Sequence, residues 1–374
     1  MKKYTTIVTA VILYSAIIVF GCDEEEMLPE IAEDTFWEVA TPSSQQMDEA
    51  VLDNLASRIE NFDNVYAFLL IRNGKIIHEQ YHNGARRNTL LHTRSVTKRV
   101  TSALLGVAIE KSFIGQTNTL LSDHFPEILT PDINPAWRDI QLYHLVNMIS
   151  GMDWVEQRDL KAFEDNFHNP LPFIFGRNIL HEPATYFSYN SPGSHLLSYV
   201  IERSTQQSLD KFAEENLFGP LRVNGFKWQA DGNDVENGGA GLELTARDMA
   251  KIGLLYLQNG RWNNQQVVAE QWVRASLDLP VDLDTLQGSY MPGATQEISQ
   301  PGISFGNMWW TDDFQGELIH YGDGYGGQVL LIIPKFEIIV AMNRIHRVGA
   351  EENRQAFDEF FGEILPAVFE SIIK

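Results

Sequence analysis

The chain has 374 residues, of which 44% are hydrophobic and 11% aromatic, and its formal net charge is −22. This composition is typical of a globular protein with one large core or two smaller ones, not of a disordered chain. The strong negative charge argues against binding to nucleic acid and against electrostatic adhesion to an anionic membrane. It does not restrict the choice of a small-molecule substrate.

The first part of the chain has the pattern of a bacterial export signal. Two lysines precede an apolar stretch, residues 5–20, which is too short to be a comfortable membrane-spanning helix. The stretch leads into Val-Phe-Gly-Cys, which resembles a lipobox and contains the only cysteine of the chain, Cys22. We therefore expect residues 1–21 to be a signal peptide and Cys22 to be lipidated. The alternative is an ordinary signal peptide with an incidental cysteine.

The segment after Cys22 is expected to be a tether with little order. Residues 22–40 begin with the acidic run Asp23–Glu26, which resembles the export signal of surface lipoproteins in the Bacteroidetes. We expect a cell-envelope protein, lipid-anchored to a bacterial membrane, with the outer-membrane surface as one possible site and the periplasm otherwise. The lipid anchor would be its only contact with the membrane.

The remaining elements, taken in chain order, predict a sheet built from both ends of the chain. An amphipathic helix over residues 47–62 precedes a β-hairpin, because two strand-like runs flank Asn73-Gly74. The middle of the chain is mainly helical, and the last part returns to short apolar runs. The predicted helices are 140–148, 194–204, 245–257 and 354–373, and the late strands are 308–310, 318–321, 328–333 and 337–342. We expect an α/β lobe from residues 41–98 and 300–374, and a helical lobe from residues 99–299.

One metal-site pattern falls on the hairpin. His78-Glu79-Gln80-Tyr81-His82 matches the His-Glu-x-x-His pattern of zinc proteases, in which both imidazoles lie on one helix face. In a strand, residues four apart are roughly 13 Å apart, too far to share one metal ion. We therefore expect no metal site here, and polar residues on an outer strand instead. A zinc protease stays as a third hypothesis, which loss of activity to a chelator would support.

The segment His92–Val100 contains the strongest candidate for a catalytic group. Apolar residues recur at spacings of three and four through residue 108, which predicts a buried helix. Ser95 would lie in its first turn, with Lys98 one turn further on the same side. The amine can accept the hydroxyl proton, because burial lowers the pKa of a lysine, and the helix N-terminus stabilises negative charge. Two other Ser-x-x-Lys matches, residues 208–211 and 371–374, lack such a helix, although an incidental serine with a surface lysine remains the alternative.

Two further segments could complete a site. Tyr189-Asn190-Ser191 lies where a loop enters a helix, and a phenol near a lysine ammonium would have a lowered pKa and could relay protons. Gly322–Gln328 enters an apolar strand, where glycines let the backbone approach a substrate carbonyl. A bulged turn is the alternative there. The loop Gly238–Gly241 either brings backbone close to a ligand or is only a turn.

With these three segments in this order, residues 36–370 resemble the serine β-lactamase-related hydrolases. The family includes class C β-lactamases, D-alanyl-D-alanine carboxypeptidases, esterases and nylon-oligomer hydrolases. The resemblance implies an α+β, β-lactamase/transpeptidase-like fold, with an antiparallel sheet flanked by N- and C-terminal helices and a mostly helical inserted lobe. It implies that Ser95 is the nucleophile, Lys98 the general base, Tyr189 the proton relay and Ser191 a polar partner. It implies no metal and no organic cofactor.

The third segment fits the family in two registers. The run Gly324–Gln328 puts Gly322 where many relatives have lysine or histidine, and puts the Tyr325 N–H in the oxyanion hole. A register shifted by two puts His320 at that position and the Asp323 N–H in the hole. We favour the first register, in which no cation would hold the carboxylate of a β-lactam.

The resulting expectation is a serine hydrolase that cleaves a small ester, amide or peptide-like substrate through an acyl-serine. It would be closer to the nylon-oligomer hydrolases and esterases than to an efficient β-lactamase. The alternative is a catalytically silent, penicillin-binding-type surface lipoprotein that binds a ligand or peptidoglycan.

Overall fold

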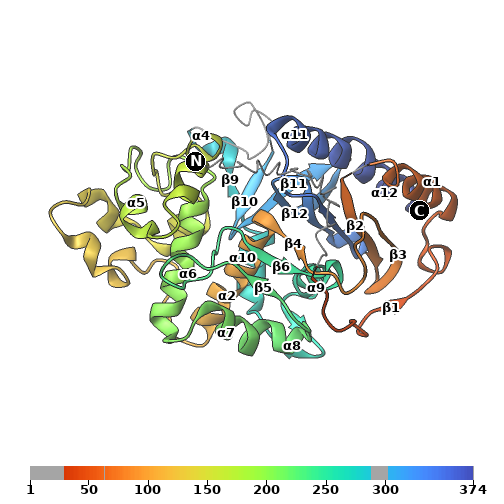
Figure 1. The fold of residues 1–374 in the computed structure, drawn as a ribbon, viewed down its shortest axis with the longest axis horizontal. Helices are drawn as coiled ribbons and strands as arrows, with labels where there is room; N and C mark the ends of the chain where they lie inside the picture. Colours follow the sequence, from red (N-terminus) through yellow and green to blue (C-terminus); the bar gives the residue numbers. More distant parts are fainter. Residues whose placement is uncertain (1–28, 63, 288–301, 374) are drawn as a thin grey trace, which may run out of the picture.

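A nine-stranded sheet runs through the molecule (Figure 1). The computed structural model describes residues 29–62, 64–287 and 302–373, so the predicted signal peptide, Cys22 and the acidic run lie outside the described residues. Neighbouring strands are antiparallel except β1 and β3, which are parallel. The strands, in spatial order, are β1 (Glu38–Val39), β3 (Lys75–Tyr81), β2 (Val65–Arg72), β14 (Ile338–Arg344), β13 (Gln328–Ile333), β12 (Glu317–Gly324), β11 (Trp309–Phe314), β10 (Ser304–Gly306) and β9 (Val281–Asp282).

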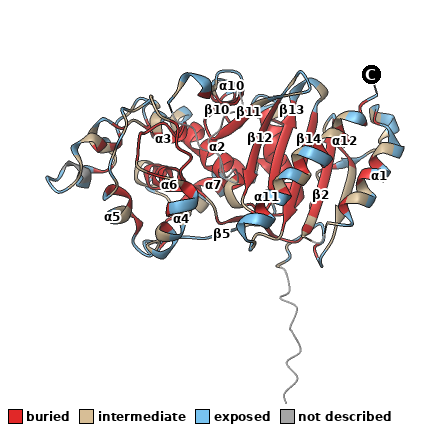
Figure 2. Ribbon diagram, turned by 90° about the horizontal axis from the view of Figure 1, so that it is seen from above, coloured by how far each residue is buried: buried red, intermediate tan, exposed pale blue. Residues whose placement is uncertain are grey.

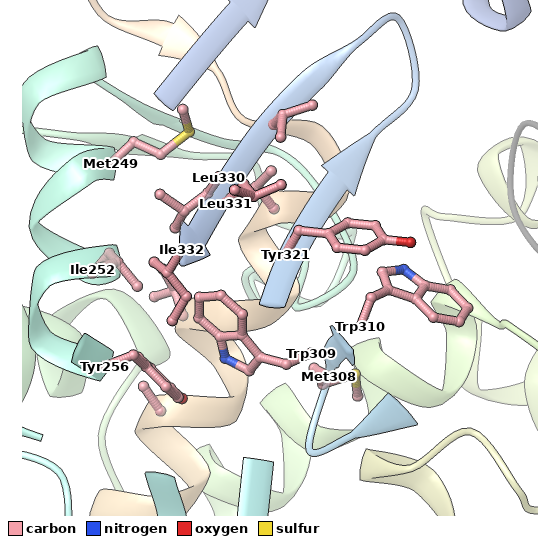
Figure 3. Close-up of a cluster of buried hydrophobic side chains, with 14 of the residues drawn as sticks. Met249, Ile252, Tyr256, Met308, Trp309, Trp310, Tyr321, Leu330, Leu331 and Ile332 are labelled. Atoms are coloured by element: carbon pink, nitrogen blue, oxygen red, sulfur yellow. The ribbon is translucent and has the colours of Figure 1, made fainter. Parts of the chain in front are cut away.

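The two chain ends meet in this sheet, because β2 pairs with β14 along almost its whole length. Helices cover both of its faces. On one face lie α1 (Glu49–Ile59), α11 (Ala350–Glu359) and α12 (Leu365–Glu370), as Figure 2 shows. On the other, α9 (Ala246–Leu257) points Met249, Ile252 and Tyr256 toward Leu330, Ile332 and Trp309 (Figure 3). Burial of both faces explains why β2, β13 and β14 are nearly continuous apolar runs.

The middle of the chain forms the mainly helical part. Its core contains α2 (Thr97–Glu110) packed against α6 (Ser191–Thr205). Its other helices are α3 (Leu142–Val146), α4 (Glu156–Asp165), α5 (Pro170–Phe175), α7 (Leu209–Ala213), α8 (Gly219–Leu221) and α10 (Glu270–Leu277). In one small sheet, β6 (Leu242–Leu244) lies between β4 (Leu91–His92) and β5 (Lys227–Trp228). In another, β7 (Arg261–Trp262) pairs with β8 (Gln265–Gln266).

Short helical turns connect these elements. The 3-10 turns are Ser43–Gln45, η2 (Arg94–Val96), Leu121–Asp123, Pro126–Leu129, Pro135–Asp139, Leu283–Thr285 and Pro334–Phe336. Two π-helical turns, Glu214–Phe218 and Phe360–Ile364, connect α7 to α8 and α11 to α12. The last of these makes the predicted C-terminal helix three consecutive pieces.

The α+β fold expected from the sequence is confirmed. The predicted hairpin is β2 and β3, joined by Asn73 and Gly74 with φ values of 51° and 71°, as a tight two-residue turn requires. Helix α9 begins after Thr245, whose hydroxyl accepts a hydrogen bond of 3.0 Å from the Asp248 N–H. The division into two lobes stays a prediction. Helix α9 belongs to the section of the chain assigned to the helical lobe, but it packs against the sheet.

The prediction of a loosely ordered tether is wrong for residues 29–40. Trp37 is only 6% exposed, and its Nε1–H donates to the Arg247 carbonyl at 3.2 Å. β1 pairs with β3, and Lys251 forms an ion pair of 3.2 Å with Asp34. Burial of an indole and pairing of backbone groups fix this segment on the surface of the folded protein.

His78 to Tyr81 of the zinc-protease pattern lie in β3, as expected, and His82 directly follows the strand. Glu79 forms ion pairs of 2.8 Å with Arg87 and Arg247, and His78 bonds to Gln80 at 3.0 Å. Among the described residues, no three histidine, cysteine or carboxylate groups are arranged to hold a metal ion. Within the same residues, no helix is both long enough and apolar enough to cross a membrane.

Candidate active site

Ser95 lies in a tight turn immediately before α2. The sequence predicted the first turn of the helix, but the structure has the 3-10 turn η2 there, and Arg94 has a φ of 48°. The Thr93 N–H donates to the Leu242 carbonyl at 2.9 Å, which ties this turn to β6. Ser95 is half-buried, so its hydroxyl is accessible while the turn is held on both sides.

Lys98 is completely buried and makes three hydrogen bonds. Its Nζ lies 2.9 Å from Ser95 Oγ, 3.1 Å from Ser191 Oγ and 2.6 Å from the Gly239 carbonyl. Burial lowers the pKa of Lys98 to about 8, against the charges of Glu156 and Asp323, which raise it. An amine with this pKa, in contact with the hydroxyl, is suited to act as a general base.

Tyr189 completes the group that the sequence analysis brought together. Lys98 Nζ lies 4.9 Å from the centroid of its ring, which stacks on Trp310 at 5.9 Å with an interplanar angle of 7°. The expectation of a lowered phenol pKa is wrong. Burial raises the pKa of Tyr189, and the opposing influences of Arg99 and of the Ser95 hydroxyl are smaller. Tyr189 therefore carries its proton at neutral pH.

Glu156 is a site residue that the sequence analysis missed. It is 6% exposed, and its carboxylate accepts hydrogen bonds from the Ser191 hydroxyl, from the Ser191 N–H at 3.1 Å and from Trp154 Nε1 at 2.6 Å. No local pattern distinguishes this residue among the 50 acidic side chains of the chain. The Gly238–Gly241 loop, for which two interpretations were open, brings the Gly239 carbonyl to Lys98.

The third segment lies beside the Ser95 turn, and the choice between its two registers stays a prediction. A Cβ added to Gly324 would come within 2.8 Å of the Arg94 Cβ and 3.0 Å of the Thr93 carbonyl oxygen. Tyr325 lines the same cleft as Ser95. His320 does not line that cleft; it is 3% exposed, and its Nδ1 bonds to the Thr311 hydroxyl at 2.8 Å.

Gly322 is matched to Arg99 on α2. A Cβ at position 322 would lie 2.3 Å from Arg99 Nε, so only glycine leaves room for this guanidinium. Arg99 is fully buried and donates to the Ser95 carbonyl at 3.1 Å and to the Tyr321 carbonyl at 2.9 Å. The Arg99 guanidinium thus lies beside Gly322, the position at which the sequence analysis expected no cation. Arg99 does not line the cleft.

The cleft containing Ser95 has a volume of about 220 Å³. One wall is apolar and comes from α4 and the loop after it, and another contains the third segment. Burial raises the pKa of Asp323, and its Oδ1 has no hydrogen-bond partner. The lining residues are His92, Arg94, Ser95, Glu156, Leu160, Phe163, Glu164, Phe167, Ser191, Gln229, Asn237, Ala240, Gly241, Asp323 and Tyr325.

A serine hydroxyl in the cleft wall, bonded to a buried lysine of lowered pKa that lies against the ring of a protonated tyrosine, is on this fold the arrangement of a serine hydrolase. The family model described as Beta-lactamase matches residues 60–358, most of the chain. The chain belongs to the β-lactamase family.

Proteins similar to this chain differ in their described activities. The chain is 23% identical over 316 residues to "6-aminohexanoate-dimer hydrolase" of Paenarthrobacter ureafaciens, which covers 77% of this chain and 76% of that protein. A structure assigned as a 6-aminohexanoate-dimer hydrolase from Bacillus anthracis matches with a TM-score of 0.69 at 20% identity, covering 92% and 91% of the two chains. EstCE1, described as a hydrolase with promiscuous acyltransferase activity, matches with a TM-score of 0.64 at 16% identity, covering 86% of this chain and all of the other. The structural matches show the fold alone.

Proposed function

We propose that this protein hydrolyses a small ester or amide through an acyl-serine intermediate. The observation that carries the proposal is the 2.9 Å contact between Ser95 Oγ and the buried Lys98 amine. Lys98 takes the hydroxyl proton as Ser95 Oγ attacks the carbonyl carbon, and a tetrahedral intermediate forms. The N–H groups of Ser95 and Tyr325 are the proposed donors to its oxyanion.

The raised pKa of Tyr189 supports a role for its phenol as the proton donor to the leaving group. Since the phenol is protonated, it donates to the leaving group as the acyl–leaving-group bond breaks, and Lys98 returns the proton to it. Water then attacks the acyl-serine, with Lys98 again as base, and Ser95 regains its proton. The names of the two 6-aminohexanoate-dimer hydrolases support an amide substrate, and the acyltransferase activity in the description of EstCE1 supports transfer of an acyl group.

The charges around the cleft make efficient β-lactam hydrolysis the less favoured activity. Arg94 is a guanidinium in the cleft wall, but its Nη2 is bonded to the His346 carbonyl at 3.0 Å. Burial lowers the pKa of Arg94, against the opposing charge of Glu164. Glu156 and Asp323 also line the cleft. A substrate carboxylate would therefore meet more acidic groups than basic ones, which disfavours its binding.

A fluorophosphonate probe tests the proposal. The purified wild-type protein should be labelled, and labelling should disappear in Ser95→Ala, because the probe bonds to an activated serine oxygen. Short esters, D-amino-acid amides, a chromogenic cephalosporin and the linear aminohexanoate dimer then define the substrate. A folded wild type that never labels contradicts the proposal and supports the silent ligand-binding lipoprotein instead.

A further inference from the structure

The hydrogen bonds of Lys98 restrict how the amine can act as a base. A neutral amine has two N–H donors and one lone pair, and only the lone pair can accept the Ser95 proton. The Gly239 carbonyl, 2.6 Å from Nζ, has no hydrogen to donate, so it always takes an N–H. Ser191 Oγ, 3.1 Å away, is a hydroxyl and could either accept from the amine or donate to its lone pair.

Glu156 decides which of these Ser191 does. The Ser191 hydroxyl donates to Glu156 Oε1, and its single hydrogen is then committed. Ser191 Oγ can only accept from Lys98, so both amine hydrogens are used by Ser191 and Gly239. The lone pair is left to face the third neighbour, Ser95 Oγ, 2.9 Å away.

We infer that Glu156 is a positioning residue: by holding the Ser191 hydroxyl hydrogen, it directs the lone pair of Lys98 to Ser95. This role rests on the proposed hydrolase function. The same carboxylate also raises the pKa of Lys98 by its charge, so it acts on both the direction and the strength of the base. It does so without touching the reacting atoms.

Glu156→Gln reverses the key hydrogen bond without changing the size of the side chain. Glu156 Oε2 accepts two N–H groups, from Ser191 at 3.1 Å and from Trp154 at 2.6 Å, so the amide oxygen of glutamine must take that position. The amide nitrogen then faces Ser191 Oγ and donates to it. Ser191 turns its own hydrogen toward Lys98 and competes with Ser95 for the lone pair.

Glu156→Gln should change the pH profile of fluorophosphonate labelling in two ways. Loss of the carboxylate charge should lower the pKa of Lys98 by about one pH unit, so the rise of the rate with pH moves to lower pH. The plateau rate should nevertheless fall about tenfold or more, because the base is misdirected. Simple structural damage would lower the plateau without that shift.

Asp159→Asn is the matched control. Asp159 is also a buried carboxylate in the first turn of α4, and it accepts from the Val155 N–H at 2.9 Å, but it does not contact Ser191 or line the cleft. This variant should keep both the wild-type plateau and the wild-type pH dependence. A matching shift in Asp159→Asn would overturn the inference.

Ser191→Ala provides the second test, because it removes the hydroxyl that transmits the effect. In this background Glu156→Gln should no longer lower the plateau. An equal loss of rate with and without the Ser191 hydroxyl overturns the inference.

A readout independent of catalysis separates this inference from the proposed function. The pKa of Lys98 is measured by NMR of ¹³Cε-labelled lysine, with the resonance assigned by its loss in Lys98→Ala. An unchanged pKa in Glu156→Gln overturns the inference whether or not the protein is active. Absence of fluorophosphonate labelling in the wild type overturns the proposed function instead.

Discussion

At the scale of single residues, Lys98 shows how burial produces a reactive amine. Its side chain is fully buried, and the three groups it contacts, Ser95, Ser191 and Gly239, are all uncharged. Desolvation penalises the ammonium form, while the charge of Arg99 lowers the pKa further. The Ser191 hydroxyl lies between Lys98 and the carboxylate of Glu156. The negative charge of this carboxylate keeps the pKa of Lys98 from falling further.

The rate of acylation should therefore rise with pH through about 8, as Lys98 loses its proton. The sign follows from the base form being the neutral amine: below this pKa the ammonium has no lone pair for the Ser95 proton. The second-order rate of fluorophosphonate labelling, measured between pH 6 and 10, checks this prediction. A profile that is flat across this range would mean that Lys98 is not the base.

The serine, lysine and tyrosine of the site could be predicted from sequence, because each lies in a recognisable local pattern. Glu156 and Arg99 could not be assigned a role, since their contacts join parts of the chain that are far apart in sequence. Glu156 reaches Ser191, 35 residues later, and Arg99 reaches the Tyr321 carbonyl, 222 residues later. The pKa of Tyr189 was misjudged because sequence shows the neighbouring cation but not the degree of burial.

At the scale of elements, the position of Ser95 depends on how closely α2 and β12 approach. Gly322 and Gly324 are two of the points of contact, against Arg99 and against the Arg94 turn. The sequence analysis treated both glycines as features of one strand. Arg99 and the Arg94 turn occupy the space that side chains at positions 322 and 324 would need.

Gly322→Ala should destabilise the protein and slow labelling, because its Cβ would lie 2.3 Å from Arg99 Nε. Displacement of a buried guanidinium that bonds to the Ser95 carbonyl should cost about 1–3 kcal/mol in the free energy of unfolding. Urea denaturation and the labelling rate measure the two effects. Gly362→Ala is the control, since nothing lies within 4 Å of a Cβ there. Equal stability of the two variants would contradict this account of the contact.

At the scale of the whole molecule, the sheet closes the chain on itself and leaves the N-terminal segment attached to the surface. The Leu90 N–H donates to the Pro29 carbonyl at 2.7 Å, so the chain is fixed to the body from residue 29 onward. The sequence could not show this, because the attachment of residues 29–40 depends on a pocket for Trp37 and on the edge of β3. The tether is therefore shorter than the sequence suggested.

This shortening gives the proposed lipid anchor a specific consequence. If Cys22 is lipidated, the six residues 23–28 lie between it and Pro29, and the seven Cα–Cα steps of a fully extended chain span at most about 25 Å. The folded body would be held close to the membrane surface, where a strongly negative protein has no electrostatic attraction to anionic lipid. The covalent anchor would then be the sole cause of membrane association.

Cys22→Ala, expressed from the full-length chain in a bacterial host, should move the protein from the membrane fraction to the soluble fraction. Fluorophosphonate labelling should be unchanged, because the described residues that line the cleft all lie between His92 and Tyr325 in the sequence. Salt washing of wild-type membranes is the control: an anchored protein stays bound, whereas one held by charge is released. A Cys22→Ala variant that fractionates with membranes as the wild type does would show that lipidation of this cysteine is not what retains the protein.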